Sequence, residues 1–120
     1  MGVTRELARE TWSEYFDALS KELLNAPVSV EIVGGPGPPL IEASHLALLA
    51  LTYDRRDDVL QIAATRGGPH LPSVLRHMVN HPEHVSVDSQ TMLAPVTIAV
   101  DGPNAVRTVI TIEHDPEITG

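Results

Sequence analysis

Three histidines, His77, His81 and His84, form the most suggestive chemistry-bearing group in the sequence. If their segment is helical, His77 and His81 lie four residues apart and project side by side, and His84 just beyond them would complete a metal-binding face. The same geometry places His81 at the border of an apolar stripe, and no carboxylate lies at helical spacing from the pair. A core-edge histidine bonded to a backbone carbonyl fits equally well. We therefore predict no metal site and keep the three histidines as candidates.

A second group consists of Asp54, Asp57 and Asp58, whose carboxylates are suited to calcium binding or to acid–base catalysis. They surround Arg55 and Arg56, which offset their charge, and aspartates in turns commonly bond to nearby backbone N–H groups. The sequence lacks the later glutamate of an EF-hand loop. The pattern therefore favours a polar turn between two strands.

A phosphate site at Thr65, Arg66 and Ser73 is the third candidate. Glycines follow at positions 67 and 68, and glycine lets backbone N–H groups converge on a phosphate. Thr65 and Arg66 end a predicted strand while Pro72-Ser73 opens a predicted helix, an arrangement that can hold one phosphate. The glycine-rich segment 34–39 contains three prolines, which lack N–H donors, and is interpreted as a turn. No serine stands in a G-x-S-x-G elbow, so nucleophilic catalysis has no support.

These candidates must be positioned by the elements around them, of which the first is a helix beginning at residue 11. Thr11 and Glu14 have the spacing of a capping box, in which both side chains satisfy backbone N–H groups at the helix start. An apolar stripe follows at steps of three and four residues, made of Trp12, Tyr15, Phe16, Leu19 and Leu23. Because this stripe holds three of the four aromatic residues, we expect the helix to pack on the core.

From residue 28 onward the apolar period falls to two, which predicts strands. The segments are 28–32, 45–53, 59–65, 84–88, 95–100 and 106–113, and a short helix between Pro72 and Pro82 separates the third from the fourth. Short turns join most neighbours, so the sheet should be mainly antiparallel. The predicted fold class is α+β: an N-terminal helix packed on a curled, mainly antiparallel six-stranded sheet or split-barrel-like barrel, with a short helix between strands 3 and 4.

Length and charge limit the functions further. At 120 residues and 13.0 kDa the chain fits a single domain, 1–120, with residues 114–120 expected to fray. Sixteen acidic residues against eight basic ones give a net charge of -8, which repels nucleic acids and anionic membranes. The sequence has no cysteine, no leader-like segment and no apolar run near the ~20 residues that span a bilayer, so we expect a cytoplasmic protein.

Several short motifs resemble a family of small bacterial domains of unassigned function. They are residues 4–7, Trp12, residues 16–20, Tyr53-Asp54 with Asp57-Asp58, and His81-Pro82 with Val85 and Val87. The likeness runs over most of the chain and implies no activity.

The order of elements is also similar to that of the flavin-binding split barrels related to pyridoxamine phosphate oxidase. The likeness rests on a leading helix, a hairpin with a Tyr-Asp turn, a strand ending at Thr65, and Pro82 before a strand. Those proteins are typically dimers that hold a flavin phosphate where a strand ends and a helix begins. The resemblance implies FMN or another flavin as cofactor, with Thr65, Arg66 and Ser73 as phosphate contacts. The basic residue that usually opens the helix is missing, because this chain has Ser73-Val74-Leu75 there.

Three functions follow from these observations, and a metal-dependent hydrolase built on the three histidines ranks last among them. Rich buried-strand patterning with little convergent polar chemistry favours a non-enzymatic protein-interaction or dimerisation module, acting as a homodimer without a cofactor. The alternative is a split-barrel protein that binds a flavin or deazaflavin, such as a reductase. A small-molecule ligand is compatible with both, whereas nucleic acid and membrane partners are not expected.

Overall fold

The computed structural model describes residues 3–34, 38–66, 73–89 and 96–113. Its helical elements are the short 3-10 helices η1 (Arg9–Thr11) and η2 (Pro103–Ala105) and the α-helix α1 (Trp12–Glu22). No helix in these ranges is long and apolar enough to cross a membrane. The strands are β1 (Val3–Glu6), β2 (Pro27–Val33), β3 (Leu40–Asp54), β4 (Val59–Arg66), β5 (Ser73–Asn80), β6 (His84–Ser89), β7 (Val96–Asp101) and β8 (Arg107–Ile112).

All the strands belong to one antiparallel sheet with the order β1-β6-β7-β8-β2-β3-β4-β5. The prediction of an α+β fold with a helix on a mainly antiparallel sheet is confirmed. Two details were wrong: within the described residues the sheet has eight strands rather than six, and it is not closed into a barrel, because β1 and β5 stand at its two ends. The predicted frayed tail, 114–120, lies outside the described residues.

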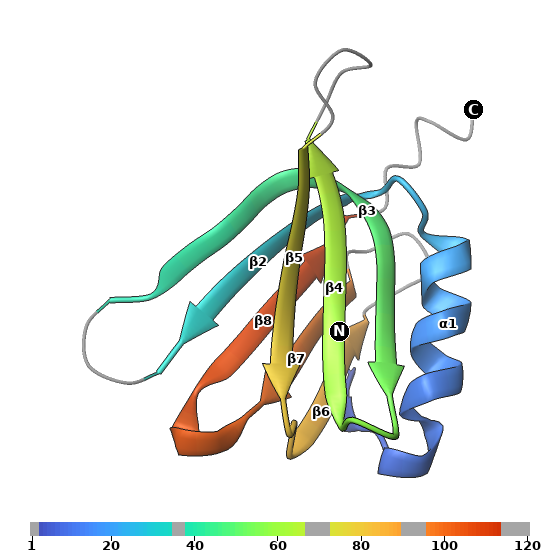
Figure 1. The fold of residues 1–120 in the computed structure, drawn as a ribbon, viewed down its shortest axis with the longest axis vertical. Helices are drawn as coiled ribbons and strands as arrows, with labels where there is room; N and C mark the ends of the chain where they lie inside the picture. The colour runs from blue at the N-terminus through green and yellow to red at the C-terminus, as the bar shows by residue number, and fades with distance from the viewer. Residues whose placement is uncertain (1–2, 35–37, 67–72, 90–95, 114–120) are drawn as a thin grey trace.

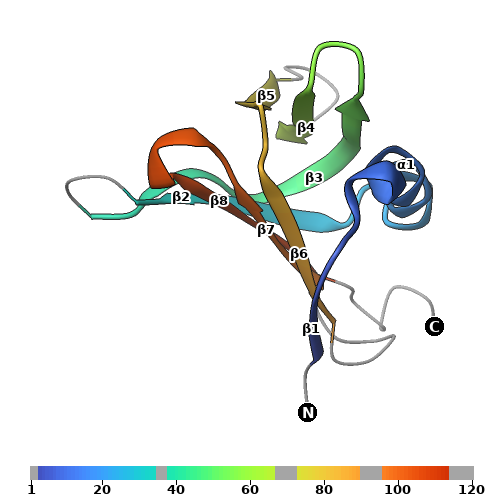
Figure 2. The same cartoon turned by 90° about the horizontal axis from the view of Figure 1, so that it is seen from below.

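The long strand β3 folds the sheet over on itself. Its first part pairs with β2 and its second part with β4, and the register with β4 shifts between Leu48 and Ala50. The β4–β5 hairpin therefore stands over the layer formed by β2, β8 and β7, as seen in Figure 2. The inward-facing residues of both layers, such as Val30, Ile110, Leu51 and Ile62, are almost fully buried. Each such side chain contributes roughly 1.5–3 kcal/mol of hydrophobic stabilisation.

Helix α1 runs along the second part of β3 (Figure 1), whose edge on this side is not paired with β2. Ser20 Oγ accepts a hydrogen bond from the backbone N–H of Leu51 at 2.8 Å, so a helix side chain satisfies the strand edge. Trp12, Phe16 and Leu19 are buried, which confirms that the aromatic stripe packs on the core. The predicted capping box was wrong, because the Thr11 hydroxyl donates backward to the carbonyl of Ala8 at 2.7 Å instead.

The predicted helix between Pro72 and Pro82 was also wrong, since residues 73–80 form strand β5. Leu75, His77 and Val79 face inward while Val74 and Met78 face outward, which is the period of two that a strand requires. Val74 and Met78 are four residues apart, a spacing that fits both a helix and a strand, so spacing alone did not distinguish the two structures. A segment this short forms a marginal helix, whereas pairing with β4 satisfies its backbone along the whole strand.

Candidate functional site

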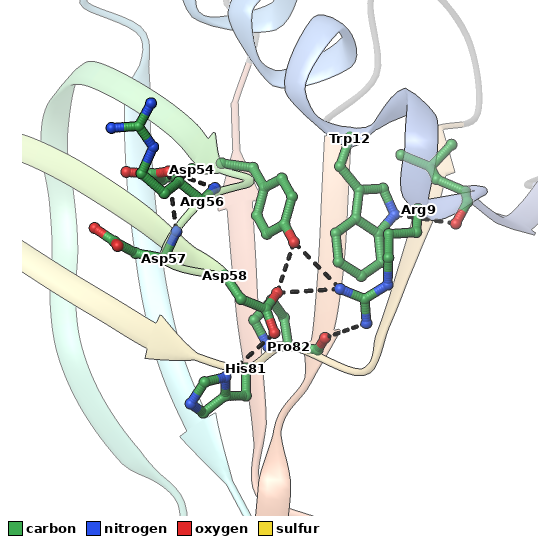
Figure 3. A network of polar contacts seen from close by, with 10 residues as sticks. Arg9, Trp12, Asp54, Arg56, Asp57, Asp58, His81 and Pro82 are labelled. Carbon is green, nitrogen blue, oxygen red and sulfur yellow. Dashed lines mark hydrogen bonds and ion pairs between the residues drawn. The ribbon is translucent and has the colours of Figure 1, made fainter.

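The most extensive polar cluster joins Arg9, Tyr53, Asp58 and His81, which we call the Arg9 clasp (Figure 3). Asp58 Oδ1 accepts hydrogen bonds from Tyr53 Oη at 2.6 Å and from Arg9 Nη1 at 3.0 Å. Its other oxygen, Oδ2, lies 3.2 Å from His81 Nδ1. Arg9 Nη2 also donates to the carbonyl of Pro82 at 2.9 Å. The clasp thus connects η1, the end of β3, the β3–β4 turn and the β5–β6 connection.

Aromatic rings hold the arginine of the clasp in place. The Arg9 guanidinium lies 4.6 Å from the ring centroid of Trp12, a cation–π arrangement. Trp12 and Tyr53 meet edge to face with centroids 5.1 Å apart, and Trp12 Nε1 donates to the carbonyl of Leu7 at 3.0 Å. The Trp12 indole is buried, and its contacts with Tyr53 and Leu7 hold it in place. The guanidinium of Arg9 packs on this fixed ring while it contacts Asp58.

Two residues of the clasp adopt left-handed backbone conformations. Asp58 has a φ of 54° and His81 a φ of 55°, and the N–H of His81 donates to the carbonyl of Asp58 at 2.8 Å. For residues other than glycine this conformation costs roughly 1–2 kcal/mol each. The hydrogen bonds of the clasp offset that cost at the point where both chain turns meet.

The electrostatics of the clasp suit a fixed ion pair better than proton transfer. The hydrogen bond from Tyr53 lowers the pKa of Asp58, assisted by His81 and Arg9. Burial raises the pKa of Tyr53, as does its contact with the Asp58 carboxylate. Both shifts move away from neutrality, so Asp58 stays ionised and Tyr53 stays a proton donor near pH 7. A general acid or base would need a pKa near the working pH instead.

The three candidate histidines have separate partners. His77 Nε2 lies 3.5 Å from Thr108 Oγ1, His81 contacts Asp58, and His84 Nδ1 lies 3.0 Å from Glu6 Oε2. The contact with Glu6 raises the pKa of His84. Within the described ranges, no group of three or more histidine and acidic side chains could hold a metal ion. The helix that would have aligned His77 with His81 is absent, because residues 73–80 form strand β5 and His81 lies just beyond its end.

The aspartates of the β3–β4 turn divide into two roles. Asp54 Oδ1 accepts hydrogen bonds from the backbone N–H of Arg56 at 2.8 Å and of Asp57 at 3.2 Å, as the polar-turn interpretation expects. Asp58 instead points to Arg9 and Tyr53, which are 49 and 5 residues away in the sequence. Sequence reasoning missed this role because nothing local to the turn indicates a partner in η1.

The candidate phosphate contacts lie at the end of the β4–β5 hairpin. The register places Arg66 opposite Ser73 and Thr65 opposite Val74, so the hairpin brings the backbone of all three candidates together. Residue 73 begins a strand rather than a helix, so the helix terminus expected to face the phosphate is not there. Residues 67–72 lie outside the described residues. Flavin binding at Thr65, Arg66 and Ser73 stays a prediction.

The outer edge of β5 is the remaining candidate site. β5 is the last strand of the sheet, and no described segment pairs with its outer edge. An open hollow of about 270 Å³ runs beside it, between β5 and η2. Its lining includes Ile32, His77 and Val79, together with Thr108, which is only 3% exposed. On the opposite face of β5, Val74 is 51% exposed and Met78 is 57% exposed.

Comparison with known proteins places the sequence in a family. A model described as a family of unknown function, DUF5335, matches residues 3–118. The chain belongs to the DUF5335 family. It is also similar to an uncharacterised protein of Aquifex aeolicus (strain VF5), with 32% identity over 87 residues that cover 72% of each chain. No solved structure matches.

Membership of the DUF5335 family confirms the predicted resemblance to a family of small domains of unknown function. The family carries no assigned chemistry, so a function for this DUF5335 chain must come from its own residues. Two features were missed by sequence reasoning, the Arg9 clasp and the edge of β5. The sequence did contain a signal for strand β5, namely the alternation of Leu75, His77 and Val79 with Val74 and Met78.

Proposed function

We propose that this protein is a non-enzymatic interaction module that forms a homodimer through the outer edge of β5. The observation that carries the proposal is an eight-residue strand at the end of the sheet with exposed Val74 and Met78. A strand edge of this kind presents a row of backbone N–H and C=O groups to a partner strand. The clasp and the turn use their polar groups internally, which supports a non-enzymatic role.

The two ends of the sheet differ in how they resist pairing. β1 is four residues long and carries both Arg5 and Glu6, and short, charged edge strands discourage association. β5 is twice as long, pairs with β4 without a register shift, and has Arg76 as its one permanently charged residue. One edge of the sheet is therefore suited to pairing while the other is protected.

A second copy of the chain is the partner that fits this edge best. The protein has a net charge of -8, yet β5 contains no acidic residue. Two copies of β5 can therefore approach without bringing carboxylates together. A two-fold symmetric pair also satisfies both edges at once and leaves no further β5 edge open, so association stops at the dimer.

Light scattering coupled to size-exclusion chromatography tests the proposal with two matched variants. Met78→Lys places a charge on the edge strand and should raise the dimer Kd by at least about tenfold. Leu24→Lys is the control, because Leu24 is 54% exposed, close to the 57% of Met78, and lies beyond the end of α1. A wild-type monomer at high micromolar concentration, or equal weakening by both variants, would contradict the proposal. Circular dichroism checks that each variant is folded.

A further inference from the structure

We propose that the two copies of β5 pair in the antiparallel register that places His77 opposite His77 of the partner subunit, and that protonation of this histidine pair releases the dimer. This inference rests on the dimer proposed above and adds its register and its regulation. It follows from three features of β5: which backbone groups point outward, how long the strand is, and where its arginine lies.

The hydrogen bonds to β4 decide which residues of β5 can bond to a partner. In an antiparallel ladder, alternate pairs are hydrogen-bonded, and the N–H of His81 donates to the carbonyl of Asp58. The register from Asp58 to Arg66 and from Ser73 to His81 is continuous, so residues 75, 77 and 79 also bond to β4. Residues 74, 76, 78 and 80 therefore direct their backbone groups outward.

Symmetry and strand length then leave two registers. In an antiparallel pair of strands, a residue whose backbone groups point outward must lie opposite another such residue. The two-fold axis of the dimer therefore passes at one residue of β5, which then lies opposite its own copy, and not between two consecutive residues. An axis at Arg76 pairs residues 73–79 and an axis at His77 pairs residues 74–80, which is seven of the eight strand residues in each case. Axes farther from the middle of the strand pair fewer residues.

Arg76 selects between these two registers. With the axis at Arg76, two guanidinium groups lie directly opposite one another, and like charges at opposed positions destabilise a sheet. With the axis at His77, Arg76 lies opposite Met78 of the partner subunit. The inward face then pairs Leu75 with Val79 of the partner subunit on both sides of the histidines. This register avoids the charge repulsion and continues the apolar inner face from one protomer into the other.

The same register makes the dimer sensitive to acid. Opposed residues at a non-hydrogen-bonded position have Cα atoms about 4.5 Å apart, so the two His77 rings would be neighbours. The residues that face His77 from the packed elements are Ile62 of β4, Thr108 of β8 and Ile32 of β2, together with η2, and none of these is titratable. With no carboxylate facing the pair, protonation of both histidines leaves their repulsion uncompensated.

Disulfide trapping tests the register on a background that has no native cysteine. Under mild oxidation, His77→Cys should form a covalent dimer, because the opposed Cα spacing suits a disulfide. Val74→Cys alone and Asn80→Cys alone should stay uncrosslinked, whereas an equimolar mixture of the two, which keeps Arg76 in both chains, should crosslink. Crosslinking of an equimolar mixture of Val74→Cys and Met78→Cys, with none for His77→Cys, would overturn the register while leaving the dimer intact.

The regulation has its own measurement. The wild-type dimer Kd should rise by about tenfold between about pH 7.5 and about pH 5.5. In His77→Gln the dimer Kd should not rise over the same range, although the variant retains His81 and His84. A rise in Kd at the lower pH that survives in His77→Gln contradicts the regulation. If wild type is monomeric throughout and no variant crosslinks, the dimer itself is wrong, which is a different outcome from a wrong register.

Discussion

Asp58 joins segments of the chain that are far apart in the sequence. Its carboxylate contacts Arg9 of η1, Tyr53 of β3 and His81 after β5, and its own backbone has the left-handed φ of 54°. Such strain persists only where the surroundings hold the residue in place. The hydrogen bonds of Asp58 therefore hold the β3–β4 turn and the β5–β6 connection against η1.

Replacing Asp58 should remove a pH-dependent part of the stability. Its pKa is lowered in the folded protein, chiefly by the hydrogen bond from Tyr53, so the stabilisation is present above the usual aspartate pKa of 3.8 and is lost as pH falls through the folded value. Asp58→Asn should lower the free energy of unfolding at neutral pH by about 1 kcal/mol, because the clasp is partly exposed. It should also show a shallower loss below about pH 4.

Urea unfolding from neutral to acidic pH provides the measurement, with Asp57→Asn as the control. Asp57 is exposed in the same turn, and its carboxylate takes no part in the clasp. If Asp58→Asn and Asp57→Asn follow wild type equally at every pH, the clasp does not contribute to stability in the way proposed here.

Among the elements, β3 determines the shape of the molecule, because it belongs to both layers of the sheet. Its first part continues the β2 layer, and its second part leaves that layer to pair with β4. The backbone of the second part then needs a new partner on its other side. Helix α1 supplies one through Ser20, so the helix completes a sheet edge as well as covering the core.

Ser20→Ala tests this role of the helix. Without the hydroxyl, the N–H of Leu51 loses its acceptor beside the buried core, which should cost about 1–3 kcal/mol. Ser13→Ala in the first turn of the same helix is the control, and it should be neutral or slightly stabilising because alanine favours helix. Chemical denaturation compares the two, and equal changes in both variants would argue against a bond that closes the strand edge.

For the whole molecule, the net charge opposes the proposed dimerisation, whereas the open edge of β5 favours it. Each protomer has a net charge of -8, so two protomers repel one another over distances beyond their contact. In the proposed homodimer the contact forms at the open edge of β5, a strand without acidic residues. Homodimer formation should therefore strengthen when the long-range repulsion is screened.

The dimer Kd should fall a few-fold when sodium chloride is raised from about 0.05 M to about 0.5 M, because the screening length shortens well below the size of the protein. Analytical ultracentrifugation at both salt concentrations measures this. The opposite trend, weaker association at high salt, would indicate that ion pairs across the interface hold the protomers together, which the proposed β5 pairing does not contain.

The sequence by itself determined the elements whose patterns are local. Alternating apolar residues, and for residues 45–53 a run that is apolar on both faces, identified six of the strands. The aromatic stripe identified α1, because burial requires these patterns wherever an element packs. Tertiary structure decided the rest. Val74 and Met78 fit a helix or a strand until β4 offered a ladder, and Asp58 looked like any turn aspartate until folding brought Arg9 beside it. Contacts between residues far apart in the sequence leave no periodic pattern, so only the folded chain reveals them.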